Sequence, residues 1–137
     1  MDAEGGFGVT TEDTLDSHLG FELIEVKEDS ARAQVPVTDR VRQPYGLVHG
    51  GVYAALAESL ASIATAKAVW DDGNIAVGLS NATNFMRPAT SGTVHATATR
   101  RHRGRTTWVW DVDMTDDEGR MCATTRVTMA VRPRPSG

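Results

Sequence analysis

The sequence predicts an α+β protein in which an antiparallel sheet wraps around one long central helix. Residues 52–66 combine strong helix formers with one charge, Glu58, whereas an ordinary surface helix carries charges along one whole side. Two strand candidates precede this helix and four follow it. Strands on both sides of a buried helix are typical of a sheet that packs around that helix.

The chain begins with a polar segment that contains glycines. Residues 1–18 predict a flexible tail with a short helix near residues 11–18, and we find no chemistry in it. Residues 21–27 and 31–37 alternate apolar and polar side chains, which predicts two strands joined by a turn at residues 28–30.

The central helix is entered through a loop and left through a turn. Residues 39–48, which include a proline and a glycine, predict the loop. Residues 71–74 predict the stop, because Gly73 suits the left-handed position after a helix. Glu58 and Lys67 interrupt the apolar stretch, and a membrane span needs about 20 apolar residues, so we expect a helix surrounded by protein.

Four strands are expected after the helix. They cover residues 76–87, 93–103, 105–115 and 120–132, with hairpin turns at Gly104 and at residues 116–119. In the third of them, Trp108, Trp110, Val112 and Met114 share one face, which predicts core packing, with ligand stacking by a tryptophan as the alternative. The aspartates nearby lack the spacing of a calcium loop, so we expect no metal site.

Composition sets limits on size, setting and partners. A chain of 137 residues that is 40% hydrophobic fits a single domain over residues 1–137. We see no secretory signal, and Cys122 has no partner for a disulfide and no metal-ligand spacing, so we expect a soluble, cytoplasmic protein without a membrane partner or a cofactor.

The acidic and basic residues are unevenly distributed. Residues 1–30 hold nine of the eighteen acidic residues and one base, so residues 31–137 are mildly basic. Twelve of the fourteen cations are arginines, which suits contacts to phosphate, although genomic composition explains arginine usage equally well. No nucleic-acid reader motif accompanies this charge, and we expect no nucleic acid partner.

Glu58 is the residue of the helix that needs an explanation. A carboxylate taken out of water without partners costs several kcal/mol or has its pKa raised, so a lone glutamate on a buried helix is a site candidate. The alternative is a glutamate that reaches solvent or pairs with an arginine. His49, Gly50 and Gly51 lie at the helix N-terminus, where free N–H groups and the helix dipole favour negative charge.

At these residues the chain resembles the hotdog-fold acyl-CoA thioesterases whose acidic residue is a glutamate of the central helix. That group includes one type of 4-hydroxybenzoyl-CoA thioesterase, the phenylacetate-pathway thioesterases and the dihydroxynaphthoyl-CoA thioesterases. The resemblance covers residues 19–134 and rests on Gln43-Pro44, Gly46, His49-Gly50-Gly51, Ala57-Glu58-Ser59 and Ser62, with later segments at residues 84–88, 106–112, 117–123 and 130–134.

The resemblance implies hydrolysis of an acyl-CoA thioester. The Gly50 N–H would polarise the carbonyl, and Glu58 would act as general base on water or as nucleophile. Gln43 would orient the carbonyl or the water, Ser62 would hold water or the carboxylate, and His49 would support the loop. The rival readings are enoyl-thioester hydration, whose histidine motif we do not find, and a non-catalytic acyl-CoA binding protein.

The later segments look closest to the 4-hydroxybenzoyl-CoA enzyme, which implies an aromatic acyl group. Ser62 replaces a threonine of that enzyme and is shared with the dihydroxynaphthoyl-CoA group, so dihydroxynaphthoyl-CoA and phenylacetyl-CoA stay as alternatives. The phosphates of coenzyme A are expected at Arg87, Arg105, Thr106, Thr107, Arg132 and Arg134, of which Arg105 departs from the family pattern.

Helix geometry predicts a homodimer with shared active sites. Gly50 and Glu58 lie eight residues apart, so roughly 12 Å separates them along one helix, whereas one thioester carbonyl must lie about 3 Å from both groups. Two antiparallel helices about a twofold axis bring Gly50 of each chain to Glu58 of the other. The resemblance implies that such dimers pair into tetramers.

Overall fold

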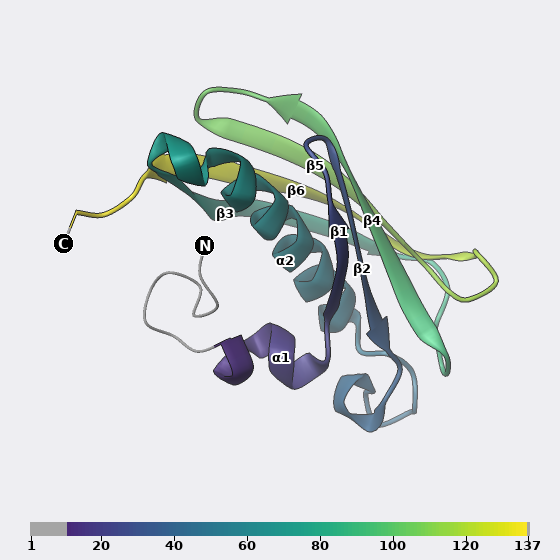
Figure 1. The fold of residues 1–137 in the computed structure, drawn as a ribbon. Coiled ribbons are helices and arrows are strands. Elements are labelled where there is room, and N and C mark those ends of the chain that lie inside the picture. The colour runs from purple at the N-terminus through teal and green to yellow at the C-terminus, as the bar shows by residue number, and fades with distance from the viewer. Residues whose placement is uncertain (1–10, 137) are drawn as a thin grey trace.

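A six-stranded antiparallel sheet curls around one long helix in the computed structural model, which describes residues 11–136 (Figure 1). The elements in chain order are η1 (Thr11–Asp13), α1 (Leu15–Leu19), β1 (Glu22–Val26), β2 (Ser30–Pro36), η2 (Asp39–Val41), α2 (Gly50–Val69), η3 (Trp70–Asp72), β3 (Asn74–Phe85), β4 (Thr93–Arg103), β5 (Thr107–Thr115) and β6 (Met121–Pro133). The α+β architecture with a central helix is therefore confirmed.

The predicted elements are present, with differences at their ends. The expected helix near residues 11–18 is a 3₁₀ turn followed by the five-residue helix α1, and the predicted tail at residues 1–10 lies outside the described part of the chain. Helix α2 has 20 residues and ends before Gly73, which adopts the predicted left-handed conformation with φ 82°. A left-handed glycine lets the chain reverse there and begin β3.

The expectation that the central helix is too short and too interrupted to span a membrane was wrong by length and composition. By length and composition, Gly50–Asp72 is long and apolar enough to cross a membrane, although half of its most apolar window is buried inside the protein. The interruption by Glu58 and Lys67 does not shorten the helix, because both residues are exposed and their charges stay in water. The sheet that packs along α2 makes it the core helix of this fold.

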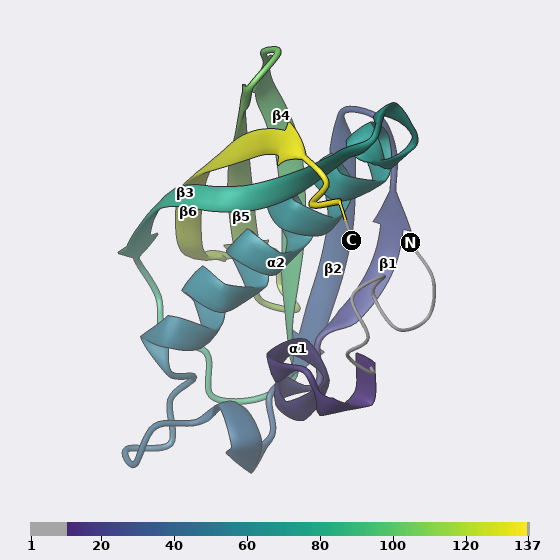
Figure 2. The same cartoon turned by 90° about the vertical axis from the view of Figure 1, so that its left-hand side faces the viewer.

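The strand order is β1-β2-β4-β5-β6-β3, and every neighbouring pair is antiparallel. Hairpins join β1 to β2, β4 to β5 and β5 to β6, whereas α2 carries the chain from β2 across the sheet to β3. The two edges are therefore β1 and β3. Figure 2 shows that β3 runs along α2 on the side opposite β1, while α1 lies beside the N-terminal half of α2.

The core lies between α2 and the concave face of the sheet. Trp108, Trp110, Val112 and Met114 are all at most 2% exposed, which confirms the core prediction for this face of β5 and argues against ligand stacking there. The indole N–H of Trp110 donates to the Thr65 hydroxyl at 2.9 Å, and that hydroxyl donates to the Ala61 carbonyl. Trp110 and Thr65 thus satisfy each other's polar groups in the core.

The convex face of the sheet is polar. Arg126 makes two hydrogen bonds to Asp111 across β5 and β6, and these bonds hold the pKa of Asp111 below its usual range. Asp113 accepts a hydrogen bond from Thr124 on the same face. These aspartates belong to cross-strand pairs, and the described residues hold no group of three or more metal-binding side chains.

Candidate active site

The sheet covers α2 on one side and leaves a strip of the opposite side open. The strip consists of Gly51, Ala55, Glu58, Ser62 and Ala66, none of which is buried. These residues lie three or four positions apart, which places them on one line along the helix surface. Glu58 is therefore exposed in the single chain, and the expected desolvated carboxylate is wrong for the chain alone, because the sheet reaches only the other side of α2.

Strand β3 approaches Glu58 from one side. A Cβ atom at Gly78 would lie 3.4 Å from Glu58 Oε2, so a glycine at this position lets the strand come close to the carboxylate. Asn81 Nδ2 lies 3.4 Å from Glu58 Oε1 and donates to the Ala54 carbonyl at 2.9 Å. The hydroxyl of Thr83 donates to Asn81 Oδ1, which fixes the amide with its N–H groups toward Glu58.

A β-bulge puts Gly78 and Asn81 on the same face. The pairing of β3 with β6 shifts between Gly78 and Ser80, so Leu79 is an extra residue. Before the bulge Ala76 and Gly78 face α2, and after it Asn81 and Thr83 do. Bulges of this kind re-aim side chains and are common beside active sites.

The N-terminus of α2 presents one unused donor. His49 is the N-cap residue, and its Nδ1 accepts a hydrogen bond from the Gly51 N–H at 2.8 Å. The Val52 N–H donates to the His49 carbonyl. Within residues 11–136 no hydrogen bond is made by the Gly50 N–H, so it is free to bind an oxyanion at the positive end of the helix dipole.

Gln43 and His49 belong to one closed loop. Its base is the bridge between Arg42 and Val48, and the His49 N–H donates to the Val41 carbonyl. The side-chain oxygen of Gln43 accepts from the Tyr45 N–H, which leaves its amide N–H groups available to a substrate. The structure therefore brings Gln43 and His49 together at the start of α2, while Glu58 and Ser62 lie further along the helix.

A cavity of about 330 Å³ adjoins Gly50 and is lined by Leu47, Tyr53, Phe85, Arg87 and Cys122, among others. A Cβ atom at Gly50 would lie 3.0 Å from the Phe85 ring, so the helix and this ring are in close contact. Burial raises the pKa of Tyr53 to about 12 and also raises the pKa of the Cys122 thiol. Both groups therefore stay protonated near neutral pH, and neither supplies a base in this cavity.

The residues expected to bind coenzyme A fall at opposite ends of α2 in one chain. Arg87 follows β3 and lies by the helix N-terminus. Arg132 donates to the Thr106 carbonyl, and Arg134 donates to the Trp70 carbonyl just beyond the C-terminus of α2. Arg105 and Thr106 lie in the exposed β4–β5 turn, and Thr107 is the first residue of β5. One chain therefore does not bring Arg87 together with Arg132 and Arg134.

Sequence reasoning missed Asn81. The residue lies in a predicted strand whose alternation could not reveal the bulge, so its side chain was assigned no direction. A glycine inside a predicted strand, here Gly78, is a signal for a bulge and was the available indication. In the structure the Asn81 amide lies 3.4 Å from the Glu58 carboxylate, and we infer that it positions this group.

The chain is similar in sequence and in fold to known thioesterases. Residues 45–123 match the Thioesterase superfamily. The chain is 38% identical to the 1,4-dihydroxy-2-naphthoyl-CoA hydrolase of Listeria monocytogenes, over 88% of this chain and 97% of that protein. It is also 38% identical to the proofreading thioesterase EntH of Cronobacter turicensis, over 89% of this chain and 88% of that protein. A thioesterase structure from Haemophilus influenzae superimposes with a TM-score of 0.84 at 39% identity, covering 88% of this chain and 84% of the other.

We predict that Asn81→Ala lowers kcat by about 10-fold to 10²-fold, because Glu58 loses the amide that orients it and small misplacements of a reacting group have effects of this size. Gln34→Ala is the matched control, since this amide lies on β2 and pairs with Glu22, away from Glu58 and from β3. Initial rates of thiol release measure both variants. Equal rates for Asn81→Ala and the control contradict the positioning role.

Proposed function

The chain belongs to the thioesterase superfamily with the hotdog fold, and we propose that it hydrolyses an aromatic acyl-CoA of the 4-hydroxybenzoyl-CoA kind to the free acid and coenzyme A. Hydrolysis of acyl-CoA-like thioesters is the activity that its relatives support. The observation that carries the proposal is the exposed Glu58 carboxylate, beside Asn81, on a helix whose N-terminal Gly50 N–H is unused.

In the proposed reaction, the Gly50 N–H donates to the thioester carbonyl oxygen and stabilises the negative charge that develops there. Removal of one such donor typically costs about 10²–10³ in rate. Glu58 either takes a proton from the attacking water or attacks the carbonyl carbon itself, forming a mixed anhydride that water then opens. In both cases the C–S bond breaks and coenzyme A leaves as the thiol.

Three residues complete the proposed site. The free amide N–H groups of Gln43 orient the carbonyl or the water, and the Ser62 hydroxyl, one turn beyond Glu58, holds water or the carboxylate. His49 supports the loop, a role that agrees with its hydrogen bond to the Gly51 N–H. That bond occupies Nδ1 and leaves the neighbouring Gly50 N–H for the substrate.

We propose that the working unit is a homodimer with two shared sites, which pairs further into a tetramer. The edge strand β3 supports this proposal, since Val77, Leu79 and Phe85 are 47%, 58% and 59% exposed. A long edge strand with apolar side chains is a surface that a second strand covers. Pairing of two β3 strands about a twofold axis would set the open strips of two α2 helices side by side and Gly50 of one chain near Glu58 of the other.

The same arrangement would assemble the coenzyme A site. Arg87 lies at the N-terminal end of α2, whereas Arg132, Arg134 and the turn at residues 105–107 lie at the C-terminal end. Two antiparallel helices would bring Arg87 of one chain to the arginines of the other. Several arginines and hydroxyls would then converge on the nucleotide phosphates.

The acyl group has named alternatives. The Listeria relative, a 1,4-dihydroxy-2-naphthoyl-CoA hydrolase, favours dihydroxynaphthoyl-CoA as the substrate. Phenylacetyl-CoA is a second alternative substrate. A protein that binds acyl-CoA without hydrolysing it is the alternative function. A thiol-release assay over aromatic and aliphatic acyl-CoAs separates them. We expect the highest kcat/KM for an aromatic ester. A higher kcat/KM for octanoyl-CoA than for every aromatic ester contradicts that choice, and binding without turnover favours the binding role.

We predict that Glu58→Gln keeps the fold and lowers kcat by at least about 10³-fold, because the amide neither accepts the proton of water nor attacks a carbonyl. Circular dichroism checks the fold, and thiol release measures the rate. Glu28→Gln, a change of an exposed glutamate in the β1–β2 turn, outside the proposed site, is the control. Near-normal turnover by Glu58→Gln removes the proposed mechanism.

The shared site predicts that two inactive chains complement each other. Proline is well tolerated at the first position of a helix, so Gly50→Pro removes the N–H while keeping α2, at the expense of a shift of the exposed Phe85 ring. The extended backbone of His49 is compatible with a following proline.

After subunit exchange between Gly50→Pro and Glu58→Ala chains, we expect one intact site in each mixed dimer, measured as thiol release above both parents. Native mass spectrometry verifies the mixed dimers. Verified mixed dimers that are no more active than their parents, or an active monomer, contradict the shared site.

For the coenzyme A site, we predict that Arg134→Ala or Arg87→Ala raises KM for the CoA ester about 10-fold or more, while a pantetheine thioester without the nucleotide phosphates shows little change. Arg101→Ala, on the convex face of the sheet, is the matched control. Steady-state kinetics with both esters supply the comparison. Equal changes in KM for the two esters contradict phosphate binding.

A further inference from the structure

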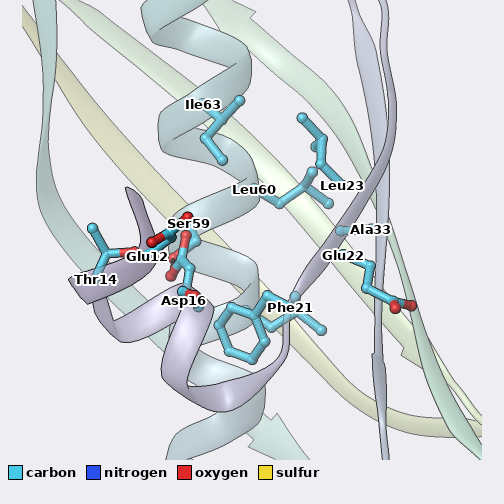
Figure 3. Close-up of a pocket in the computed structure, with 12 residues that line it drawn as sticks. Glu12, Thr14, Asp16, Phe21, Glu22, Leu23, Ala33, Ser59, Leu60 and Ile63 are labelled. Atoms are coloured by element: carbon cyan, nitrogen blue, oxygen red, sulfur yellow. Dashed lines mark hydrogen bonds between the residues drawn. The ribbon is translucent and has the colours of Figure 1, made fainter. Parts of the chain in front are cut away.

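A second cavity, of about 320 Å³, lies between α1, β1 and α2 (Figure 3). Apolar side chains from β1, β2, α2 and the residue before β1 form one side of it, namely Leu23, Ala33, Leu56, Leu60, Ile63 and Phe21. Figure 3 shows Glu12, Asp16 and Ser59 gathered at the other side, where α1 meets α2. Small-molecule sites typically measure roughly 300–1,000 Å³, so this cavity suits a small and mainly apolar group.

The cavity lies on the side of α2 next to the open strip that holds Glu58. With 3.6 residues per turn, Ser62, Ser59 and Ile63 lie about 40°, 100° and 140° from Glu58 around the axis of α2. Ser62 belongs to the open strip, and Ser59 and Ile63 line the cavity. Going around the helix from Glu58, the surface therefore passes from the open strip at Ser62 to the cavity at Ser59 and Ile63.

The wall formed by α1 is held by a specific hydrogen bond. Helix α1 has five residues, none of them fully buried, and Leu19 at its C-terminal end packs against the core. The Ser59 hydroxyl donates to Asp16 Oδ1 at 2.6 Å. A hydrogen bond of this length to a carboxylate is of the strong, charge-assisted kind. It joins α1 to the residue that follows Glu58 in the chain.

We propose that this cavity receives the acyl group of the substrate, and that the bond between Asp16 and Ser59 fixes α1 as the wall that limits the size of that group. The proposal rests on the proposed thioesterase function and adds a residue pair that determines its specificity. The apolar side of the cavity, formed by Leu60, Ile63 and Ala33, receives the hydrocarbon surface of the acyl group. The wall at Asp16 stops groups that extend further.

Two esters of different size test the proposal. The quantity measured is the ratio of kcat/KM for 2-naphthoyl-CoA to kcat/KM for benzoyl-CoA. A ratio cancels any effect on the chemical step that both esters share, so a loss of catalysis alone leaves it unchanged. Ser59→Ala and Asp16→Ala each remove the hydrogen bond that holds α1 against α2. We expect the ratio to rise about 10-fold or more in both variants, which is the usual effect when the fit changes by a methylene or more.

The two changes break one bond, so the double variant is expected to show the same ratio as either single variant. Ser91→Ala and Asp29→Asn are matched controls, since both residues are exposed and lie outside the cavity. A ratio within about twofold of the wild type in both Ser59→Ala and Asp16→Ala overturns the proposal.

A larger side chain on the opposite wall of the cavity is expected to lower the ratio of the two kcat/KM values. Ala33 is 7% exposed and lies on β2, where Ala33→Leu fills the cavity. We expect Ala33→Leu to lower the same ratio about 10-fold or more. Thermal unfolding checks that this variant folds. An unchanged ratio in a folded Ala33→Leu protein places the acyl group elsewhere and also overturns the proposal.

The experiment distinguishes this proposal from the proposed function. If the wild type releases thiol from straight-chain esters only, the ratio is taken between decanoyl-CoA and hexanoyl-CoA with the same expected directions. If no acyl-CoA is hydrolysed by the wild type, the proposed function fails. Turnover whose size preference ignores Asp16, Ser59 and Ala33 contradicts the acyl cavity alone.

Discussion

The packing of α2 against the concave face of the sheet is the contact on which the rest of the structure depends. Leu56, Leu60 and several alanines of the helix meet the inward side chains of β2, β4, β5 and β6. Alanine side chains let the sheet come close to the helix, and the large residues of β5 fill the remaining space. Each functional group described above takes its direction from the orientation of this one helix.

The sheet covers only one side of α2, so the other side is free to carry the residues of the proposed site. A helix covered all round would bury Glu58 without a partner, at a cost of several kcal/mol. Here the open strip keeps Glu58 in water in the single chain while Gly78 and Asn81 approach it from the edge strand. A surface that is open, next to an apolar edge, stays available both to substrate and to a second subunit.

Much of the fold and part of the site followed from the sequence. Period-two alternation and turn residues located all six strands, and the composition of residues 52–66 located α2, because these signals are local. The lone Glu58 and the glycines before the helix stood out for the same reason. Asn81 and the contact between Asp16 and Ser59 could not be predicted, since they depend on a bulge and on packing between segments far apart in the chain.

The rotation of α2 about its axis links the core to both sides of the site. Alanines on the sheet side specify that rotation weakly, because apolar contacts are not directional. The hydrogen bond from the Trp110 indole to Thr65 is directional and fully buried, so a turned or shifted helix would leave the indole N–H unpaired, at about 1–3 kcal/mol. Thr65 lies seven residues, or two turns, from Glu58. A buried polar pair in the core therefore fixes the direction in which the carboxylate faces Asn81 and Ser59 faces α1.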